Sequence, residues 1–427
     1  MKTISQLKDE IQNGIYDDRL IDIYVESDLL SYQKQRYIHT LDLFEEYFGD
    51  GDVRIFSAPG RTEVGGNHTD HQHGEVIAAS INKDAIAVTK AIPGGPIRLI
   101  SDGGALITID LSSLDPSEKE NGTTAALIRG VCAGMKDHGY NIGGFDAYVT
   151  SDVLIGAGLS SSAAFETLIG TILSHLYNDG RATSIEIAII GQYAENVFFG
   201  KPCGLMDQMA CSVGGLIHID FADPSDPVVE KVDCDFATFG YPLCITDTKG
   251  SHADLTDEYA AVPLEMKKVA AHFGKEVLHE VDEDEFKKSI PDLRKSFGDR
   301  AVLRAIHFYE ENKRVKKEVS CLDKKDIDGF LKTVRLSGDS SFKYLQNVYT
   351  SRDVTSQNVS VALAVSEIVL DGEGAARVHG GGFAGTIQAF VPKKKVDAYK
   401  ESLDDVFGAG SCSILEIRKY GGIAVTD

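Results

Sequence analysis

Apolar side chains recur at helical spacing in several long stretches of the chain. Between residues 165 and 176, six of them fall at i, i+3, i+4, i+7, i+8 and i+11, which predicts a helix with one buried face. We also predict helices over 123–136 and 184–199 and through most of 253–345. Residues 1–50 alternate charged and apolar positions at helical spacing, and we expect their larger apolar side chains to face one core: Leu29, Tyr32, Tyr37, Leu41, Leu43, Phe44 and Phe48.

Short apolar runs separated by turn residues predict strands elsewhere. GGP and DGG turns interrupt the runs between residues 75 and 115, a pattern typical of an antiparallel sheet. The stretch 253–345 is strongly charged, and we expect those charges to form a solvated surface and not a binding site. The predicted strands cover 53–58, 85–88, 97–100, 106–111, 144–152, 214–221, 242–247 and 386–391.

Length and composition restrict the class of protein. A chain of 427 residues is long enough for two or three domains. We predict two, 1–214 and 215–427, with closing strands that could return to the first. The net charge of −22 argues against nucleic acid and against an anionic membrane as partner. The start lacks the apolar core of a signal peptide, and the seven cysteines form no CxxC pair, so we expect a cytoplasmic protein with reduced thiols.

The loop 154–164, LIGAGLSSSAA, opens directly into the helix predicted after residue 164. Gly156 and Gly158 allow a close backbone approach to a ligand, and Ser160, Ser161 and Ser162 supply hydroxyls that can cap the helix. A helix N-terminus offers unpaired N–H groups and partial positive charge, which favours an anion. The loop by itself fits a phosphate cradle and an ordinary capped turn equally well.

Two acidic residues stand in apolar surroundings downstream. Glu195 shares a helical face with Ala188 and Gly191, and a carboxylate there needs a cation or a donor as partner. A lysine or arginine of the core would serve, but a phosphate loop nearby favours Mg²⁺. Asp207 is bracketed by cysteine, leucine and methionine, which indicates either a capped structural residue or a functional one.

Residues 57–74, SAPGRTEVGGNHTDHQHG, are dense in glycine, histidine and acid, and we expect them on a loop between strands. His68, Asp70, His71 and His73 could ligate a metal, but no HExxH supports this. A polar rim for a hydroxyl-rich ligand is the favoured interpretation, because these side chains both donate and accept.

The stretch RVHGGGFAG, 377–385, matches GxGxxG formally through Gly380, Gly382 and Gly385. A strand is predicted after it instead of a helix, which rejects a dinucleotide site. No GxxxxGK[ST] sequence occurs, so a P-loop is excluded. We expect a glycine-rich turn that lies beside the ligand of another loop.

Taken in order, the segments PGRTEVGGNHTDHQHG, LIGAGLSSSAA and VHGGGFAG resemble the three motifs of the GHMP small-molecule kinases, and galactokinases most closely. The galactokinase pattern GRxNxIGEHTDYxxG is similar to residues 60–74, and AENVFFGKPCGLMDQ is similar to the segment that carries its magnesium ligand and base. The resemblance extends from about residue 57 to about residue 392. The matching positions of the first motif are Gly60, Arg61, Gly66, His68, Thr69, Asp70 and Gly74.

The resemblance implies an α+β fold of two GHMP kinase-like domains with the active site in the cleft between them. It implies an enzyme that transfers phosphate from ATP, with Mg²⁺, to the anomeric (C1) hydroxyl of galactose, and that is a monomer or a weak homo-oligomer. Asp207 matches the catalytic base and Arg61 its partner, while Ser162 and Glu195 match the Mg²⁺ ligands. ATP phosphates would lie on Gly156, Ala157, Gly158, Leu159, Ser160, Ser161 and Ser162, and the sugar on Glu63, Asn67, His68, Asp70, His71 and Tyr259, the last seven residues after His252.

The departures from the family pattern concern the sugar. Asn67 replaces the GEH glutamate, Glu63 the GRxN asparagine and His71 the tyrosine, and Ala384 replaces a glycine of the third motif. Two like charges about 4 Å apart cost on the order of 4 kcal/mol at an effective dielectric constant of 20, so Asn67 would tolerate a uronic acid that a glutamate would repel. A galacturonokinase, or a kinase of another galactose-like sugar, is therefore one alternative, and a non-catalytic sugar sensor is another.

Overall fold

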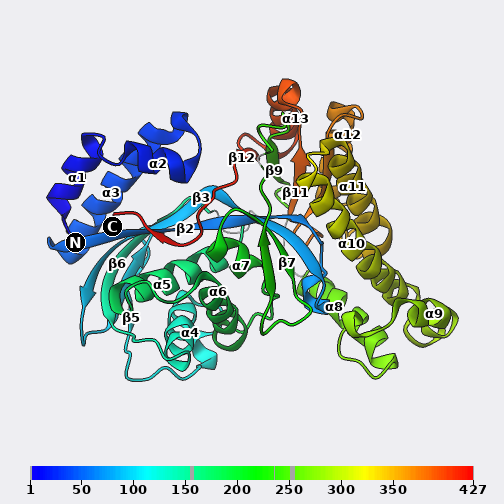
Figure 1. Cartoon of the computed structure of the whole chain (residues 1–427), viewed down its shortest axis with the longest axis horizontal. Helices are drawn as coiled ribbons and strands as arrows, with labels where there is room; N and C mark the ends of the chain where they lie inside the picture. The colour runs from blue at the N-terminus through cyan, green and yellow to red at the C-terminus, as the bar shows by residue number, and fades with distance from the viewer. Residues whose placement is uncertain (1, 154–157, 235, 251–254, 427) are drawn as a thin grey trace.

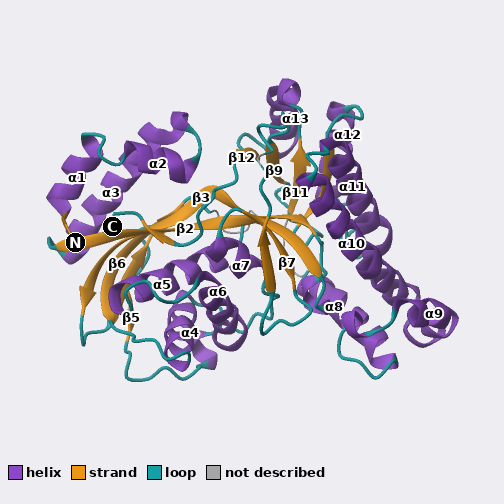
Figure 2. Cartoon of the chain, viewed as in Figure 1, coloured by secondary structure: helices purple, strands orange, loops and turns teal. Residues whose placement is uncertain are grey.

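The computed structural model describes residues 2–153, 158–234, 236–250 and 255–426, and it has an α+β fold built on two sheets (Figures 1 and 2). The nine-stranded sheet follows the order β1-β2-β3-β6-β4-β5, with β7 and β13 pairing β3 and β2 and with β8 pairing β7. Its strands are β1 (Lys2–Thr3), β2 (Asp52–Gly65), β3 (Glu75–Ile92), β4 (Ile97–Ser101), β5 (Ile107–Ile109), β6 (Gly144–Ser151), β7 (Leu216–Asp220), β8 (Val228–Lys231) and β13 (Ile423–Ala424). The four-stranded sheet has the order β10-β11-β9-β12, from β9 (Leu243–Asp247), β10 (Ala375–His379), β11 (Thr386–Phe390) and β12 (Cys412–Leu415).

The large sheet is antiparallel, as predicted, except where β4 runs parallel to β6. Its two central strands are far longer than the predicted runs, because both of their faces are covered and polar residues inside them are buried with partners. Asp84, which interrupts the apolar pattern of β3, forms ion pairs with Arg36 at 2.7 Å and with Arg418 at 3.0 Å. β2 likewise continues to Gly65, so Arg61 and Glu63 lie on a strand and not on the predicted loop.

The N-terminal segment is helical, as predicted, and forms α1 (Ile4–Gln12), α2 (Asp17–Tyr24) and α3 (Leu30–Phe48) on one face of the large sheet (Figure 1). Tyr37, Leu41 and Phe44 are buried there against Val53 and Ile55 of β2. The prediction was wrong for Tyr32, which is 50% exposed on α3. Its hydroxyl donates instead to Asp152.

The opposite face of the large sheet carries α4 (Thr124–Asp137), α5 (Ser161–Tyr177), α6 (Ser184–Tyr193) and α7 (Met206–Val213). The helix predicted over 184–199 is α-helical only to Tyr193 and continues as a π-helical turn, Ala194–Phe199. Such turns are rare and frequently occur at functional sites. This one contains Glu195.

The second half of the chain adds helices beside the four-stranded sheet: α8 (Thr256–His272), α9 (Glu283–Phe297), α10 (Asp299–Asp323), α11 (Ile327–Ser340), a π-helical turn (Ser341–Leu345), α12 (Asn358–Leu370) and α13 (Val396–Phe407). The expectation that their charges are solvated was wrong for one face of α10, because α10 contacts β2 and β3. The buried residues of that face include Arg304, His307, Glu311 and Glu318. Short 3₁₀ turns occur at Ser27–Leu29, Asp70–Gln72, Glu118–Glu120, Leu278–Glu280 and Lys393–Lys395.

The large sheet extends past the boundary predicted at residue 214. β7 and β8 join it after that point, and β13 returns to it at the end of the chain. β2 and β3 run from the N-terminal helices to the neighbourhood of α8 and α10, so they connect the two halves (Figure 1). Within the described residues, no helix is long and apolar enough to cross a membrane.

Candidate active site

Arg61 and Asp207 form the centre of the site. Arg61 lies near the end of β2, and Asp207 lies in the first turn of α7. The guanidinium Nε donates to Asp207 Oδ1 at 2.6 Å and Nη2 donates to Oδ2 at 2.8 Å, a bidentate pair. Arg61 Nη1 also donates to the carbonyl of Gly158 at 2.5 Å. The first motif, the serine loop and the Asp207 segment therefore meet at one point.

The surroundings of Asp207 keep it ionised. Burial by itself would raise the pKa of this carboxyl, but Arg61 and the Ser160 hydroxyl outweigh it and hold the pKa below its usual value. Ser160 Oγ donates to Asp207 Oδ2. A buried carboxylate that is charged at neutral pH can accept a proton or orient a hydroxyl group.

The serine loop is described from Gly158 onward; Gly156 and Ala157, like His252, lie outside the described residues. Gly158 has a φ of 69°, and a Cβ there would lie 2.4 Å from Thr386 Oγ1, so this position requires glycine. Leu159 is buried, and its carbonyl accepts from the Arg61 backbone N–H at 3.1 Å.

Of the three serines whose hydroxyls could cap the following helix, Ser160 occupies the capping position but does not act as a cap. Ser160 has a left-handed backbone, with a φ of 56°, and makes no side-chain cap to α5. Its hydroxyl donates to the Asp207 carboxylate instead. α5 begins at Ser161 with its N–H groups uncapped by this side chain, an arrangement that suits an anion.

Glu195 lies on the π-helical turn with its carboxylate nearly sealed from solvent. Oε1 accepts from Ser162 Oγ at 3.0 Å and from Lys201 Nζ at 2.9 Å. Oε2 accepts from Gln208 Nε2 at 2.8 Å. Of the two partners that the sequence suggested, a cationic side chain is present, although Lys201 is 61% exposed and lies outside the core. The serine of the predicted metal pair lies within hydrogen-bond distance of the same carboxylate.

Glu166 is a buried acid that the sequence reasoning missed. Gln208 Nε2 lies 3.0 Å from Glu166 Oε2 and so bridges it to Glu195. Burial, reinforced by the Glu195 charge, raises the pKa of Glu166 well above its ordinary value. The signal was available, because Glu166 interrupts the apolar face of the helix that follows the serine loop, as Glu195 does in its own helix.

The donor set around Glu195 fits magnesium. Mg²⁺ takes few protein oxygens and keeps water and phosphate as its other ligands, and one hydroxyl 3.0 Å from one carboxylate oxygen suits that preference. The alternative metal site on the first motif receives no support. In the described part of the chain, no group of three or more histidine, cysteine or acidic side chains is arranged to hold a metal ion.

His68 and His71 form a hydrogen-bonded pair, with His68 Nδ1 2.8 Å from His71 Nε2. His68 Nε2 lies 3.1 Å from the Gly381 carbonyl, which can only accept, so His68 carries its proton on Nε2 and His71 donates to Nδ1. Burial lowers the pKa of His68 to about 3 and that of His71 to about 4. Both rings are therefore neutral at physiological pH.

Asp70 and Tyr259 lie in the same region. Burial raises the pKa of Asp70 to about 6, and the Asp207 charge adds to the shift. Asp70 lies against Gly204, three residues before Asp207. The Tyr259 hydroxyl donates to the Gly382 carbonyl at 2.8 Å. Asp70 thus faces the Asp207 segment, while His68 and Tyr259 both contact the glycine-rich turn of the third motif.

Glu63 and Asn67 are placed differently from the other sugar candidates, because both are buried. Asn67 Nδ2 donates to Glu63 Oε1 at 3.0 Å and to the Gly380 carbonyl at 2.7 Å. Asn67 Oδ1 accepts from Asn347 Nδ2 at 2.9 Å and from Ser341 Oγ at 3.3 Å. The protein itself therefore uses every polar group of the Asn67 amide.

The contact between Glu63 and Asn67 explains two departures from the family pattern together. Relative to that pattern, the amide and the carboxylate have exchanged positions. The carboxylate on β2 is paired with the fully buried Arg377, whose Nη2 donates to Glu63 Oε1 at 2.8 Å. Arg377 and Asn347 were not predicted from the sequence.

Buried polar residues of α10 support the turn that carries Asn67. His307 Nε2 lies 2.9 Å from the Asn67 carbonyl, and Glu311 Oε1 accepts from the Gly66 and Asn67 N–H groups at 3.3 and 3.4 Å. Gly66 has a φ of 89° and no room for a Cβ beside Glu75. Burial would raise the pKa of Glu311, but Arg314 and other donors lower it to about 2.

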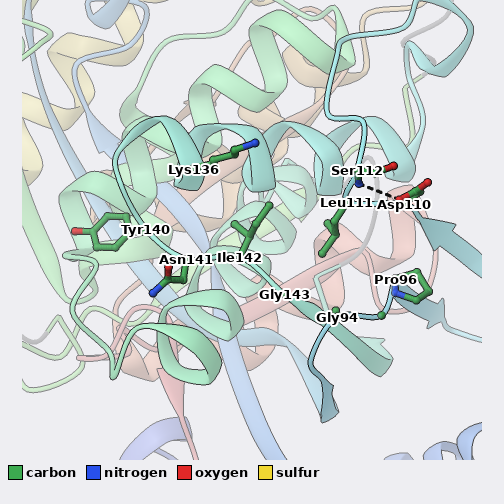
Figure 3. Close-up of a pocket in the computed structure, with 12 residues that line it drawn as sticks. Gly94, Pro96, Asp110, Leu111, Ser112, Lys136, Tyr140, Asn141, Ile142 and Gly143 are labelled. Atoms are coloured by element: carbon green, nitrogen blue, oxygen red, sulfur yellow. Dashed lines mark hydrogen bonds between the residues drawn. The ribbon is translucent and has the colours of Figure 1, made fainter.

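A groove of about 730 Å³ lies elsewhere, between the C-terminal end of α4 and the turn before β4 (Figure 3). Lys136, Tyr140 and Asp110 line it, and none of the predicted site residues does. Gly144, at the start of β6, borders this groove, whereas the end of β6 leads toward the serine loop. The groove is therefore separate from the Asp207 site.

Comparisons with known proteins agree with this geometry. Residues 42–91 match the galactokinase galactose-binding signature, and residues 126–215 match the GHMP kinases N terminal domain. The crystal structure of Lactococcus lactis galactokinase complexed with galactose superposes with a TM-score of 0.78 at 24% identity, covering 91% of this chain and 99% of that one. Methanococcus jannaschii mevalonate kinase gives a TM-score of 0.59 at 17% identity, covering 86% and 99%.

The fold and the site thus define a GHMP kinase, a phosphotransferase that acts on an alcohol group. The galactokinase of Actinobacillus pleuropneumoniae serotype 3 is 30% identical over 371 residues, which cover 85% of this chain and 91% of the relative. That of Streptomyces coelicolor is 29% identical over 368 residues, covering 86% and 92%. The chain belongs to the galactokinase family and is a sugar kinase.

Proposed function

We propose that this enzyme transfers the γ-phosphoryl group of ATP to the C1 hydroxyl of galactose. The observation that carries the proposal is the Asp207 carboxylate, held ionised by Arg61 between the serine loop and the sugar-signature residues. Relatives whose printed name is galactokinase, at about 30% identity over most of the chain, support the choice of sugar.

In the proposed mechanism, Asp207 orients the acceptor hydroxyl and takes its proton, within about 3 Å. Arg61 keeps Asp207 ionised and stabilises charge that develops on the transferred group. The N-terminus of α5 with Ser160, Ser161 and Ser162 receives the phosphates. Ser162 and Glu195 would hold Mg²⁺, which supplies charge neutralisation for phosphoryl transfer.

For the sugar, we propose His68, Asp70, His71 and Tyr259 as contacts. His71 donates to His68 through Nε2 and keeps Nδ1 as an acceptor for a hydroxyl group, whereas His68, with both ring nitrogens bonded within the protein, would contact the sugar by exchanging one of these bonds. We propose a positioning role for Glu63 and Asn67, because their polar atoms bind other parts of the protein. They shape the turn on which His68 and Asp70 stand.

ADP release with Mg-ATP tests this function across galactose, galacturonate, N-acetylgalactosamine and arabinose. We expect the highest kcat/KM with galactose, and phosphorus NMR of the product should show a phosphate on C1. ADP release with galacturonate and none with galactose would reject the proposed substrate. Measurable galactose binding with no ADP release from any sugar would instead indicate a non-catalytic sensor.

The pKa of Asp70 predicts an acid limb in the activity of the enzyme. Between pH 8 and about 6 Asp70 is ionised and accepts hydrogen bonds from a hydroxyl; below about pH 6 it gains a proton and loses that capacity. Since Asp207 keeps a lowered pKa and His68 and His71 stay neutral to about pH 4, we expect kcat/KM for galactose to fall about tenfold per pH unit below 6.

Steady-state kinetics from pH 5 to 8 measure this limb, with circular dichroism to verify that the protein stays folded. The Asp70→Asn variant should be less active at pH 8 and should have a flat profile down to pH 5. An acid limb of unchanged position in that variant would assign the limb to another group.

A further inference from the structure

The ammonium group of Lys201 contacts the carboxylate of Glu195, which we propose as a magnesium ligand. Its Nζ lies 2.9 Å from Glu195 Oε1, the same oxygen that accepts from Ser162 Oγ at 3.0 Å. In the described structure, a single carboxylate oxygen is therefore shared by the hydroxyl of the proposed metal pair and by an ammonium group. The ammonium takes the cationic position beside these two ligands.

The charges around Lys201 explain why a cation is needed there. Three acids face it: Glu195 directly, and Asp207 and Glu166 at longer range. Arg61 is committed to Asp207 by its bidentate pair. A buried carboxylate such as Glu195 is costly without a positive partner, and Lys201 provides one.

The lysine can leave while the carboxylate stays. Glu195 is only 2% exposed, and its second oxygen is held by Gln208 at 2.8 Å. The Lys201 side chain is 61% exposed and follows Gly200, which ends the π-helical turn. A long, flexible stem in solvent lets the ammonium move without disturbing the residues that fix Glu195.

We propose that Lys201 is an internal cation that competes with the divalent metal for Glu195, so that the metal binds more tightly when the nucleotide is present. The inference rests on the proposed function, because it takes Ser162 and Glu195 as the metal pair. A nucleotide brings phosphate groups, which give the displaced ammonium a new anionic partner. Free metal brings no such partner, so it must break the ion pair between Lys201 and Glu195 without a compensating interaction for the ammonium.

Mn²⁺ binding, measured by the loss of the free-ion signal in electron paramagnetic resonance, tests the proposal without turnover. Without nucleotide, the Lys201→Met variant should bind Mn²⁺ about five- to tenfold more tightly than the wild-type protein, as expected for removal of one competing ion pair. With ADP present, the difference should shrink to within about twofold. Lys201→Arg, which keeps the charge, should remain nearer to the wild-type protein than Lys201→Met does.

A matched control is Lys313→Met, because Lys313 pairs with Glu283 at 2.6 Å with similar exposure but lies on α10, outside the site. It should leave Mn²⁺ affinity unchanged. The proposal is overturned if Lys201→Met binds free Mn²⁺ no more tightly than wild type, if neither protein binds it at the highest concentration used, or if Lys201→Arg tightens binding equally.

The Glu195→Gln variant separates this inference from the proposed function. If that substitution abolishes Mn²⁺ binding in the presence of ADP, the metal pair is supported, and an unchanged Lys201→Met variant then rejects only the competition. If Glu195→Gln binds Mn²⁺ with ADP as well as wild type, the metal assignment itself fails.

Discussion

Replacing Asp207 by asparagine should lower kcat by about two to four orders of magnitude, the usual contribution of a general base. Asparagine keeps the size of the side chain, so the surroundings of Arg61 and Ser160 stay similar. It cannot accept the proton of the sugar hydroxyl, and it removes the charge that Arg61 balances at 2.6 and 2.8 Å. Galactose and ADP should still bind, as measured by calorimetry, since the loss lies in the transition state.

The chain offers a matched control in Asp146→Asn. Asp146 is also buried and also forms a bidentate pair, with Arg98 at 2.6 and 2.7 Å, but between β4 and β6. This variant should lose stability and keep kcat near the wild-type value. Near-normal turnover in Asp207→Asn would remove Asp207 from the role of base, and an equal loss of kcat in both variants would point to unfolding.

Replacing Glu63 by glutamine should cost about 3–5 kcal/mol of unfolding free energy, the range observed when one partner of a buried ion pair is removed. Arg377 is fully buried, and the Nη2 that donates to Glu63 would then face no charge. Burial raises the pKa of Glu63 although Arg377 opposes the shift, which indicates how strongly the site is desolvated. Urea denaturation with a common m-value measures the loss.

The double variant Glu63→Gln with Arg377→Met should recover part of this loss, because neither member of the pair is then left charged without the other. Glu283→Gln, which breaks an exposed ion pair with Lys313, should cost less than about 1 kcal/mol. If Glu63→Gln also costs less than about 1 kcal/mol, the pair of Glu63 with Arg377 does not stabilise the fold. At a temperature where Glu63→Gln is folded, an unchanged KM for galactose supports the positioning role, whereas a raised KM supports direct sugar contact.

The segments that contribute residues to the candidate site were predictable from the sequence. Glu195 and Asp207 stand out because an acid in an apolar stretch needs a partner, and the structure supplies Ser162, Lys201 and Arg61. The sequence analysis missed Glu166, an acid of the same kind that interrupts the apolar face of α5, the helix before these two residues.

Strand lengths and buried charges were not predictable from local pattern. The strand predicted at 85–88 began after Asp84, although β3 runs from Glu75 to Ile92. A polar residue beside an apolar run is normally exposed, but here Arg36 and Arg418, distant in sequence, pair with Asp84. The charges of α10 were assigned to solvent for the same reason. Helical spacing shows which residues share a face. It does not show that β2 and β3, from the first half of the chain, cover the charged face of α10.

Glu63 and Asn67 illustrate the limit most directly. Their exchange relative to the family pattern is visible in the sequence, and by itself it suggested an altered sugar contact. The structure shows the two side chains bonded to each other at 3.0 Å and to Arg377 and Gly380. Contact across the tight turn at Gly66 depends on a backbone conformation that residue spacing does not report.

The amino-acid sequence by itself determined the family, the two acids that need a partner, Glu195 and Asp207, and the helix that starts at the serine loop, since these depend on residue type and spacing. Only the tertiary structure decided which polar residues are available to a ligand and which are hydrogen-bonded to other parts of the protein. That division depends on partners more than two hundred residues away, such as Arg377 for Glu63 and His307 for Asn67. Burial and hydrogen bonding are properties of the assembled chain, so local pattern cannot report them.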